Sequence, residues 1–337
     1  MNRPVSTCGY DPELFDIPEW LPIDHNPNST EVWVDMHHLK RVSIVGSKGS
    51  HSFTRESVPA DILDRAERIV VYDFATGQPS LEDWEIDWVK KLADQRPLVW
   101  LTLNPKSIDG IKTVRFDYYW NRTKKAFLDQ TPTHKLKDAR NFVQYPWHAD
   151  LRTKKCMSYY SRTEPYRARV GQFLQDRYEG FYNDGHNNQW LEPNVQIDNH
   201  HSFQASCAPP ARHYFDQSYV TCIIETCYIN KNSILFSEKT YDHLIQGRAV
   251  LNFATPGFYQ QLMDDGWAMP QGIDWSWNSI LDDETRLAAY LHTVDKLLDQ
   301  PIEELHQWFL ENRDVWLHNQ NMLESKPYDI IDPTRIW

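Results

Sequence analysis

The chain has 337 residues, of which 41% are hydrophobic and 13% aromatic, and its formal net charge at pH 7 is −12. This length suffices for two domains of ordinary size with a substantial core. No apolar run is long enough to cross a bilayer, and the N-terminal residues, which include Pro4, Asp11 and Pro12, do not form a signal peptide. The five cysteines lie at scattered spacings without a CxxC pair. We therefore expect a cytoplasmic protein with reduced thiols and no membrane partner.

The first part of the chain alternates between predicted strands and helices. Residues 1–30 are rich in proline and polar groups, and we expect an irregular lead-in there. Apolar runs predict strands over 32–34, 42–45, 68–72, 97–103 and 114–118, and helical spacing predicts helices over 81–93 and 120–128. Such alternation is typical of a parallel sheet covered on both faces. We therefore predict a first α/β domain over residues 1–150.

Positive charge is concentrated in the middle of the chain. Between Arg122 and Arg169, twelve Lys or Arg face four Asp or Glu, so this segment carries +8 and the rest carries −20. A basic segment between acidic flanks indicates a local site for an anion. That anion can be as small as a diphosphate.

A second alternation of strands and helices follows. Apolar runs predict strands over 156–160, 219–224 and 249–253, and helices over 166–178, 258–263, from Asp283 and from Pro301. Residues 179–218 are polar and rich in Asn and His, which predicts loops. Their histidines lack the spacing of metal ligands, so we predict no metal site. We assign 151–325 to a second α/β domain and 326–337 to a C-terminal tail.

Three arginines lie in or beside the turn between the strand 156–160 and the next helix. They are Arg162, Arg167 and Arg169, and Pro165 suits the first helical position. Ligands of open parallel sheets bind at the carboxyl ends of strands, and the planar guanidinium donates two parallel hydrogen bonds to phosphate. A solvated helix face is the alternative, and it fits Arg169 better than Arg167.

The stretch 235–251 is the most informative part of the sequence. A polar turn, Ser237 to Thr240, precedes a short helix that Gly247 ends, and a buried strand follows. The helix N-terminus attracts anions because its backbone N–H groups and its dipole point toward them. A plain structural interpretation is also open, in which Ser237 caps the helix, Glu238 favours its first turn and Lys239 is solvated.

Several linked motifs in the second domain resemble one family. A strand ends on Glu225, Phe236-Ser237-Glu238-Lys239-Thr240 and Ala249-Val250-Leu251 follow in order, then Pro256-Gly257, and upstream lies the helix start 162–167. Together these resemble the donor-binding half of the fucosyltransferases and of fucosyltransferase-like glycosyltransferases of bacteria and their viruses, over roughly residues 153–300. The resemblance implies a GT-B enzyme with two facing Rossmann-like domains. The nucleotide-sugar would bind the C-terminal domain and the acceptor the N-terminal one.

The resemblance also implies roles for individual residues. The donor-binding set would be Arg162, Arg167, Glu225, Ser237, Glu238, Lys239 and Thr240. Lys239 and Arg167 would neutralise the diphosphate of a UDP- or GDP-sugar, Glu238 would bond sugar or ribose hydroxyls, and Glu225 would lie near the donor sugar. The sequence has no Asp-x-Asp motif, so we expect no metal and no cofactor beyond the donor. Gln246 stands eight residues after Glu238, where many retaining enzymes carry a second Glu, so we expect inversion.

Inversion by single displacement needs a general base beside the acceptor hydroxyl. Asp73 follows the strand 68–72 and is the first candidate, ahead of Asp35 and His148. A strand-end carboxylate can instead cap the next helix. The chain shows neither the membrane anchor nor the luminal disulfides of the animal enzymes, which favours the cytoplasm of a bacterial cell or a phage-infected host.

Three hypotheses remain open about function. The first is a glycosyltransferase that acts on a glycan or a small hydroxyl acceptor. The second keeps the reaction but uses the basic segment 122–169 to hold duplex DNA with a hydroxymethylated pyrimidine, as a bacteriophage DNA glycosyltransferase does. The third is a sugar- or nucleotide-binding protein without catalysis, since a fold match alone proves no chemistry.

Overall fold

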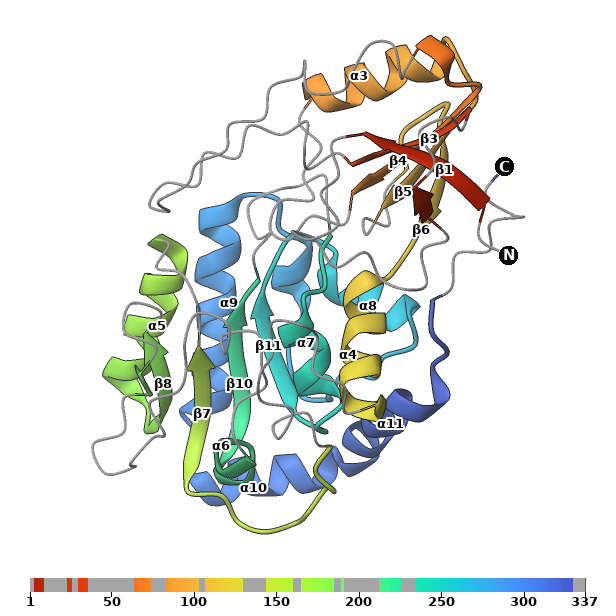
Figure 1. Ribbon diagram of the computed structural model, residues 1–337. Coiled ribbons are helices and arrows are strands. Elements are labelled where there is room, and N and C mark those ends of the chain that lie inside the picture. The colour runs from red at the N-terminus through yellow and green to blue at the C-terminus, as the bar shows by residue number, and fades with distance from the viewer. Residues whose placement is uncertain are drawn as a thin grey trace. The chain divides into compact units, whose positions relative to one another are not determined.

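The structure is a computed structural model, and it describes most of the second half of the chain and parts of the first. The described residues are 3–8, 23–25, 30–35, 64–73, 83–102, 107–129, 144–159, 165–184, 189–190, 212–225, 234–329 and 337. Figure 1 shows helices and strands in mixed α/β order. Among the described residues, no helix is both long and apolar enough to cross a membrane.

The chain divides into two compact units. The first comprises 1–118, 232–234 and 329–337, and the second comprises 119–231 and 235–328. The chain thus passes from one unit to the other near residue 118 rather than near residue 150. The reason is helix α4 (Tyr118–Asp129), which packs in the second unit. The hydroxyl of Thr123 in this helix donates a hydrogen bond to Oδ1 of Asp242 over 3.1 Å.

The first unit contains a six-stranded sheet. Its strand order is β2-β1-β3-β4-β5-β6, and all neighbouring pairs are parallel. The strands are β1 (Arg3–Cys8), β2 (Ile23–His25), β3 (Glu31–Asp35), β4 (Arg68–Asp73), β5 (Leu98–Thr102) and β6 (Lys112–Arg115), and helix α3 spans Asp83–Ala93. Val89 of α3 is fully buried with Ile69 and Val71 of β4, because a parallel sheet needs a helical cover. The C-terminal residue also belongs here, since Lys112 Nζ donates to the Trp337 carbonyl over 2.7 Å.

The second unit contains a five-stranded sheet in the order β11-β10-β7-β8-β9, parallel except for the last pair. The strands are β7 (Lys154–Tyr159), β8 (Gly180–Asp184), β9 (Gln189–Trp190), β10 (Ser218–Ile224) and β11 (Ala249–Phe253). The helices are α4, α5 (Pro165–Arg177), α6 (Arg212–Gln217), α7 (Glu238–Leu244), α8 (Phe258–Asp264), α9 (Asp283–Leu298), α10 (Ile302–Glu311) and α11 (Arg313–Ser325).

Helices cover both faces of β10. Thr221 Oγ1 lies 3.1 Å from Nδ1 of His243 in α7, whereas the neighbouring Cys222 contacts Tyr290 of α9. Successive side chains of a strand point to opposite faces, so α7 and α9 lie on opposite sides of the sheet. Cys222 and Cys156 are buried free thiols. These features confirm the predicted α/β class with parallel sheets.

Two predictions about irregular segments are wrong. Residues 1–30 contain β1 and β2, which are strands of the first sheet rather than a lead-in. Residues 179–218 contain β8, β9 and α6 in addition to any loops. In both segments the apolar pattern is too short to indicate a strand, and pairing with neighbours in the sheet decides the conformation. The predicted strand over 42–45 lies outside the described residues.

Candidate functional site

The candidate site lies at the carboxyl end of β10, where Glu225 follows the strand. The side chain of Glu225 is 1% exposed. Its Oε1 accepts hydrogen bonds from the backbone N–H of Ser237 at 3.3 Å, from the Ser237 hydroxyl at 2.9 Å and from the Thr240 hydroxyl. Burial raises the pKa of Glu225 above 4.5, and these donors and the charge of Lys239 oppose that rise. A buried carboxylate therefore fixes the first turn of α7 against the end of the sheet.

Ser237 occupies the N-cap position of α7 without capping it through its side chain. Its φ and ψ are −81° and 170°, which are extended values that suit a cap residue, yet its hydroxyl makes no capping hydrogen bond. The hydroxyl bonds Glu225 instead. The interpretation of Ser237 as a plain helix cap is therefore wrong, because a buried carboxylate is the stronger acceptor.

Thr240 extends the polar cluster to the neighbouring strand. It is completely buried, and its Oγ1 accepts a 2.6 Å hydrogen bond from Nδ2 of Asn252, a buried residue of β11. Sequence analysis did not single out Asn252. A polar side chain inside the apolar run 249–253 was the signal, since buried polar groups are nearly always hydrogen-bonded.

Glu238 and Lys239 form an ion pair at the start of α7. The Lys239 ammonium lies 2.5 Å from Glu238 Oε1, and the two side chains are only 15% and 10% exposed. Lys239 is therefore not the solvated surface residue of the plain structural interpretation. The ion pair holds the Lys239 ammonium near Glu225, at the edge where parallel sheets bind ligands.

The start of α5 reaches the same edge. Arg167 is 5% exposed, and its Nη2 lies 3.5 Å from the carbonyl oxygen of Ile224, the last residue of β10. Tyr166 stacks on Phe253 at the end of β11, with ring centroids 5.9 Å apart. Arg169 is exposed and pairs with Glu284 over 2.8 Å, as its placement on a solvated face predicted. Arg162 lies outside the described residues.

The three candidate bases occupy different places. Asp35 and Asp73 are the last residues of β3 and β4, which are parallel neighbours, so both lie at one edge of the first sheet. His148 belongs to the second unit. Its Nε2 lies 3.1 Å from Asp216 and its Nδ1 3.3 Å from Asp150.

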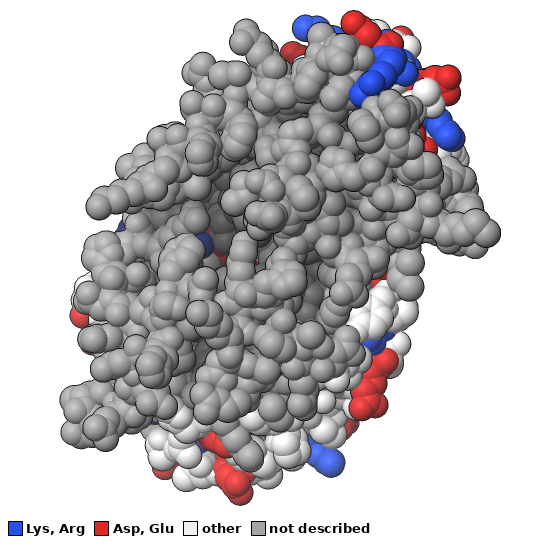
Figure 2. All heavy atoms as spheres, viewed as in Figure 1, with Lys and Arg blue, Asp and Glu red and all other residues white. Residues whose placement is uncertain are grey.

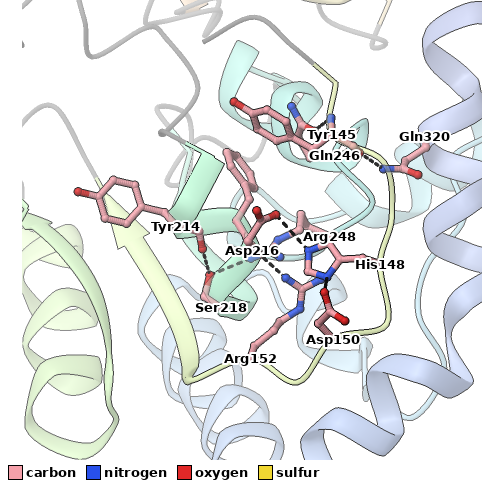
Figure 3. A network of polar contacts seen from close by, with 11 residues as sticks. Tyr145, His148, Asp150, Arg152, Tyr214, Asp216, Ser218, Gln246, Arg248 and Gln320 are labelled. Atoms are coloured by element: carbon pink, nitrogen blue, oxygen red, sulfur yellow. Dashed lines mark hydrogen bonds and ion pairs between the residues drawn. The ribbon is translucent and has the colours of Figure 1, made fainter.

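Figure 3 shows His148 beside Asp150 and Asp216. These surroundings lie at the opposite end of β10 from Glu225. Asp216 belongs to α6, which immediately precedes β10, whereas Glu225 follows that strand. Seven residues of extended strand separate the two ends by roughly 20 Å. The geometry therefore gives no support to His148 as a base acting beside Glu225.

Several basic residues of the segment 122–169 lie inside the second unit rather than on its surface. Lys124 is 5% exposed and donates to the carbonyl oxygens of Glu324 and Lys326. Arg152 and Arg167 are buried as well. On the face in Figure 2, the described acidic and basic side chains are intermixed along the margins. Three of the twelve basic residues of this segment are therefore buried inside the second unit and do not contribute to a charged surface.

No three His, Cys, Asp or Glu side chains among the described residues gather in a group able to hold a metal ion. The arrangement at the end of β10 instead offers cations, a buried carboxylate and hydroxyl groups. Comparisons with protein-family models, with curated proteins and with solved structures find no match to this chain.

Proposed function

We propose that this protein is a glycosyltransferase that moves a sugar from a UDP- or GDP-sugar to a hydroxyl group of a glycan or a small molecule. One observation supports the proposal above others. Residues from three separate segments, Arg167, Glu225 and the turn 237–240, meet at the carboxyl end of β10. Nucleotides bind at this edge in open parallel sheets, where strand ends and helix starts converge.

In the proposed reaction, an acceptor hydroxyl oxygen attacks the anomeric carbon while the bond from that carbon to the diphosphate oxygen breaks. Positive charge develops on the sugar ring and negative charge on the leaving nucleoside diphosphate. Lys239 and Arg167 are the proposed partners of the diphosphate, and Glu238 that of a sugar or ribose hydroxyl. Glu225 holds the turn through Ser237 and Thr240, so we assign these three residues a positioning role rather than direct contact with the donor.

The proposal places acceptor binding on the first unit, as in a GT-B enzyme with facing Rossmann-like domains. The acceptor proton passes to a carboxylate there, with Asp73 as the first candidate and Asp35 as the second. Both end neighbouring parallel strands, so either one lies at a ligand-binding edge. No Asp-x-Asp motif is present, and we propose that cationic side chains serve the leaving group without a metal.

Thermal denaturation with UDP, GDP and their sugars, without added metal, tests the donor site. A nucleotide at a hundred times its dissociation constant stabilises its binding unit by about 2.7 kcal/mol, which raises the melting temperature by roughly 5–10 °C. We expect this shift in the wild type and in Arg169→Ala, whose arginine is exposed on the same helix as Arg167. We expect its loss in Lys239→Ala.

If no nucleotide stabilises the wild type, the proposed donor site is refuted. If a nucleotide does stabilise it, a measurement of sugar release from the donor distinguishes an enzyme from a binding protein. The enzyme hydrolyses or transfers the sugar and loses this activity in Asp73→Asn, whereas a binding protein shows the thermal shift without turnover. Transfer to hydroxymethylated DNA but not to glycans would establish the DNA-modifying alternative instead.

A further inference from the structure

A small cavity lies in the second unit at the amino ends of β7, β10 and β11. Figure 3 shows several of the residues that line it. Its volume is about 10 Å³, which is the room needed by one water-sized particle. It is lined by Tyr145, Pro146, Trp147, His148, Arg152, Phe215, Asp216, Gln246 and Arg248. Two of these are buried arginines from different segments, Arg152 before β7 and Arg248 before β11, at 3% and 2% exposure.

The two guanidinium groups converge on one acceptor. Nη1 of Arg152 donates to the carbonyl oxygen of Phe215 over 2.6 Å, and Nη1 of Arg248 donates to the same oxygen. Nη2 of Arg248 donates to the Ser218 hydroxyl over 2.8 Å. The Nε–H groups of both arginines are buried and have no hydrogen-bond acceptor within the part of the chain that the structure describes. The two guanidinium groups thus keep hydrogen-bond donors that the described residues do not satisfy.

Two buried positive charges face one carboxylate in the lining of the cavity. Among the described residues, Asp216 is the only carboxylate that lines the cavity, and its Oδ1 is engaged by His148 Nε2. Asp150 is 87% exposed, and neither arginine makes an ion pair. Burial lowers the pKa of Arg152 to about 10, although Tyr219, Asp216 and Asp150 oppose that shift. Burial and the charge of Arg152 lower the pKa of Arg248, and Asp216 opposes that shift as well. Two buried cations that share one carbonyl repel each other, and the single carboxylate Asp216 can offset only one of their two charges.

We propose that this cavity binds a small monatomic anion, with chloride as the probe, between Arg152 and Arg248. An anion there would accept hydrogen bonds from the guanidinium groups of the two arginines and would offset the second positive charge. Chloride is only slightly larger than a water molecule, so a single ion matches the volume of the cavity. The bound ion would join the segments that precede β7, β10 and β11. This site is independent of the proposed donor site, which lies at the opposite end of the sheet.

Chloride titration at constant ionic strength tests the site, with gluconate as the replaced anion. We expect the melting temperature of the full chain to rise saturably with chloride, and chloride-35 NMR to show line broadening that bromide reverses. Arg177→Gln is the matched control, because Arg177 is exposed and pairs with Asp295. It keeps both effects, whereas Arg248→Met loses both.

Asp216→Asn provides a second test that does not depend on the folding of an arginine variant. Removal of a nearby negative charge should tighten chloride binding by roughly tenfold. A purely structural role of the arginines predicts no such gain. The proposal is overturned if chloride and gluconate stabilise the wild type equally, if Asp216→Asn leaves chloride affinity unchanged, or if phosphate binds while chloride does not.

Discussion

Thr240→Val probes the hydrogen bonds that hold the end of β10. The substitution removes the hydroxyl of a completely buried residue and keeps its branched shape. Two interactions disappear with it, the donation to Oε1 of Glu225 and the acceptance from Nδ2 of Asn252. The change therefore leaves a buried carboxylate with one donor fewer and a buried amide without its acceptor.

The expected loss of stability follows from these two interactions. A hydrogen bond to a charged group contributes about 1.5–3 kcal/mol, and a buried donor left without an acceptor costs about 1–3 kcal/mol. Because the two effects share one hydroxyl and neighbours relax, we expect a decrease of about 3–5 kcal/mol in the free energy of unfolding. That is a large share of the stability of an ordinary domain.

Urea denaturation of the full chain at several pH values measures this loss. Burial raises the pKa of Glu225 in the folded state above 4.5, so its contribution to stability is greatest below pH 4.5 and falls as the pH rises through the folded-state value. Thr240 opposes that fall by donating to the charged form. The loss caused by Thr240→Val is therefore largest at pH 8 and shrinks toward pH 4.5.

Thr285→Val is the matched control. The Thr285 hydroxyl also donates to a carboxylate, Asp282 Oδ1 at 2.6 Å, but at the exposed start of α9. We expect a loss several times smaller there, because water replaces the missing donor. Equal losses for the two variants, or a loss at Thr240 that does not change between pH 8 and pH 4.5, would refute the assigned role of Glu225.

Two further predictions concern stability. Burial and the charges of Arg248 and Lys239 lower the pKa of His243 well below 6.5, so its contribution to stability is present above pH 6.5 and is lost as the pH falls below it. His243→Gln should flatten the fall in unfolding free energy from pH 7 to pH 5.5, by up to about 1.4 kcal/mol per pH unit, and an unchanged slope would contradict a buried neutral histidine. Gly247→Ala should destabilise the protein more than Gly266→Ala in urea denaturation. Both glycines have positive φ, 65° at Gly247 and 92° at Gly266. A Cβ would lie 3.1 Å from the Gln320 side chain at Gly247, but 3.6 Å from Met322 at Gly266. Equal losses would show that the Gln320 side chain moves away from the new methyl group at little cost.

Local sequence determined most of the elements of the second unit. The apolar runs over 219–224 and 249–253 became β10 and β11, and Pro165 is the first residue of α5. Gly247 follows α7 in the left-handed conformation that ends a helix. These features depend on residues that are close in sequence. Arg167, Glu225 and the turn 237–240, which the resemblance grouped as donor-binding residues, meet at one edge of the second sheet.

Only the tertiary structure decided which polar groups are buried and what they bind. Ser237 has the sequence of a helix cap, yet its hydroxyl bonds Glu225, twelve positions away. Arg152 appeared as one charge of a basic segment and Arg248 had no assigned role, but both donate to the carbonyl of Phe215. Such pairings join residues that are far apart in the chain. No local pattern specifies them, because they depend on which strand ends the folded sheet brings together.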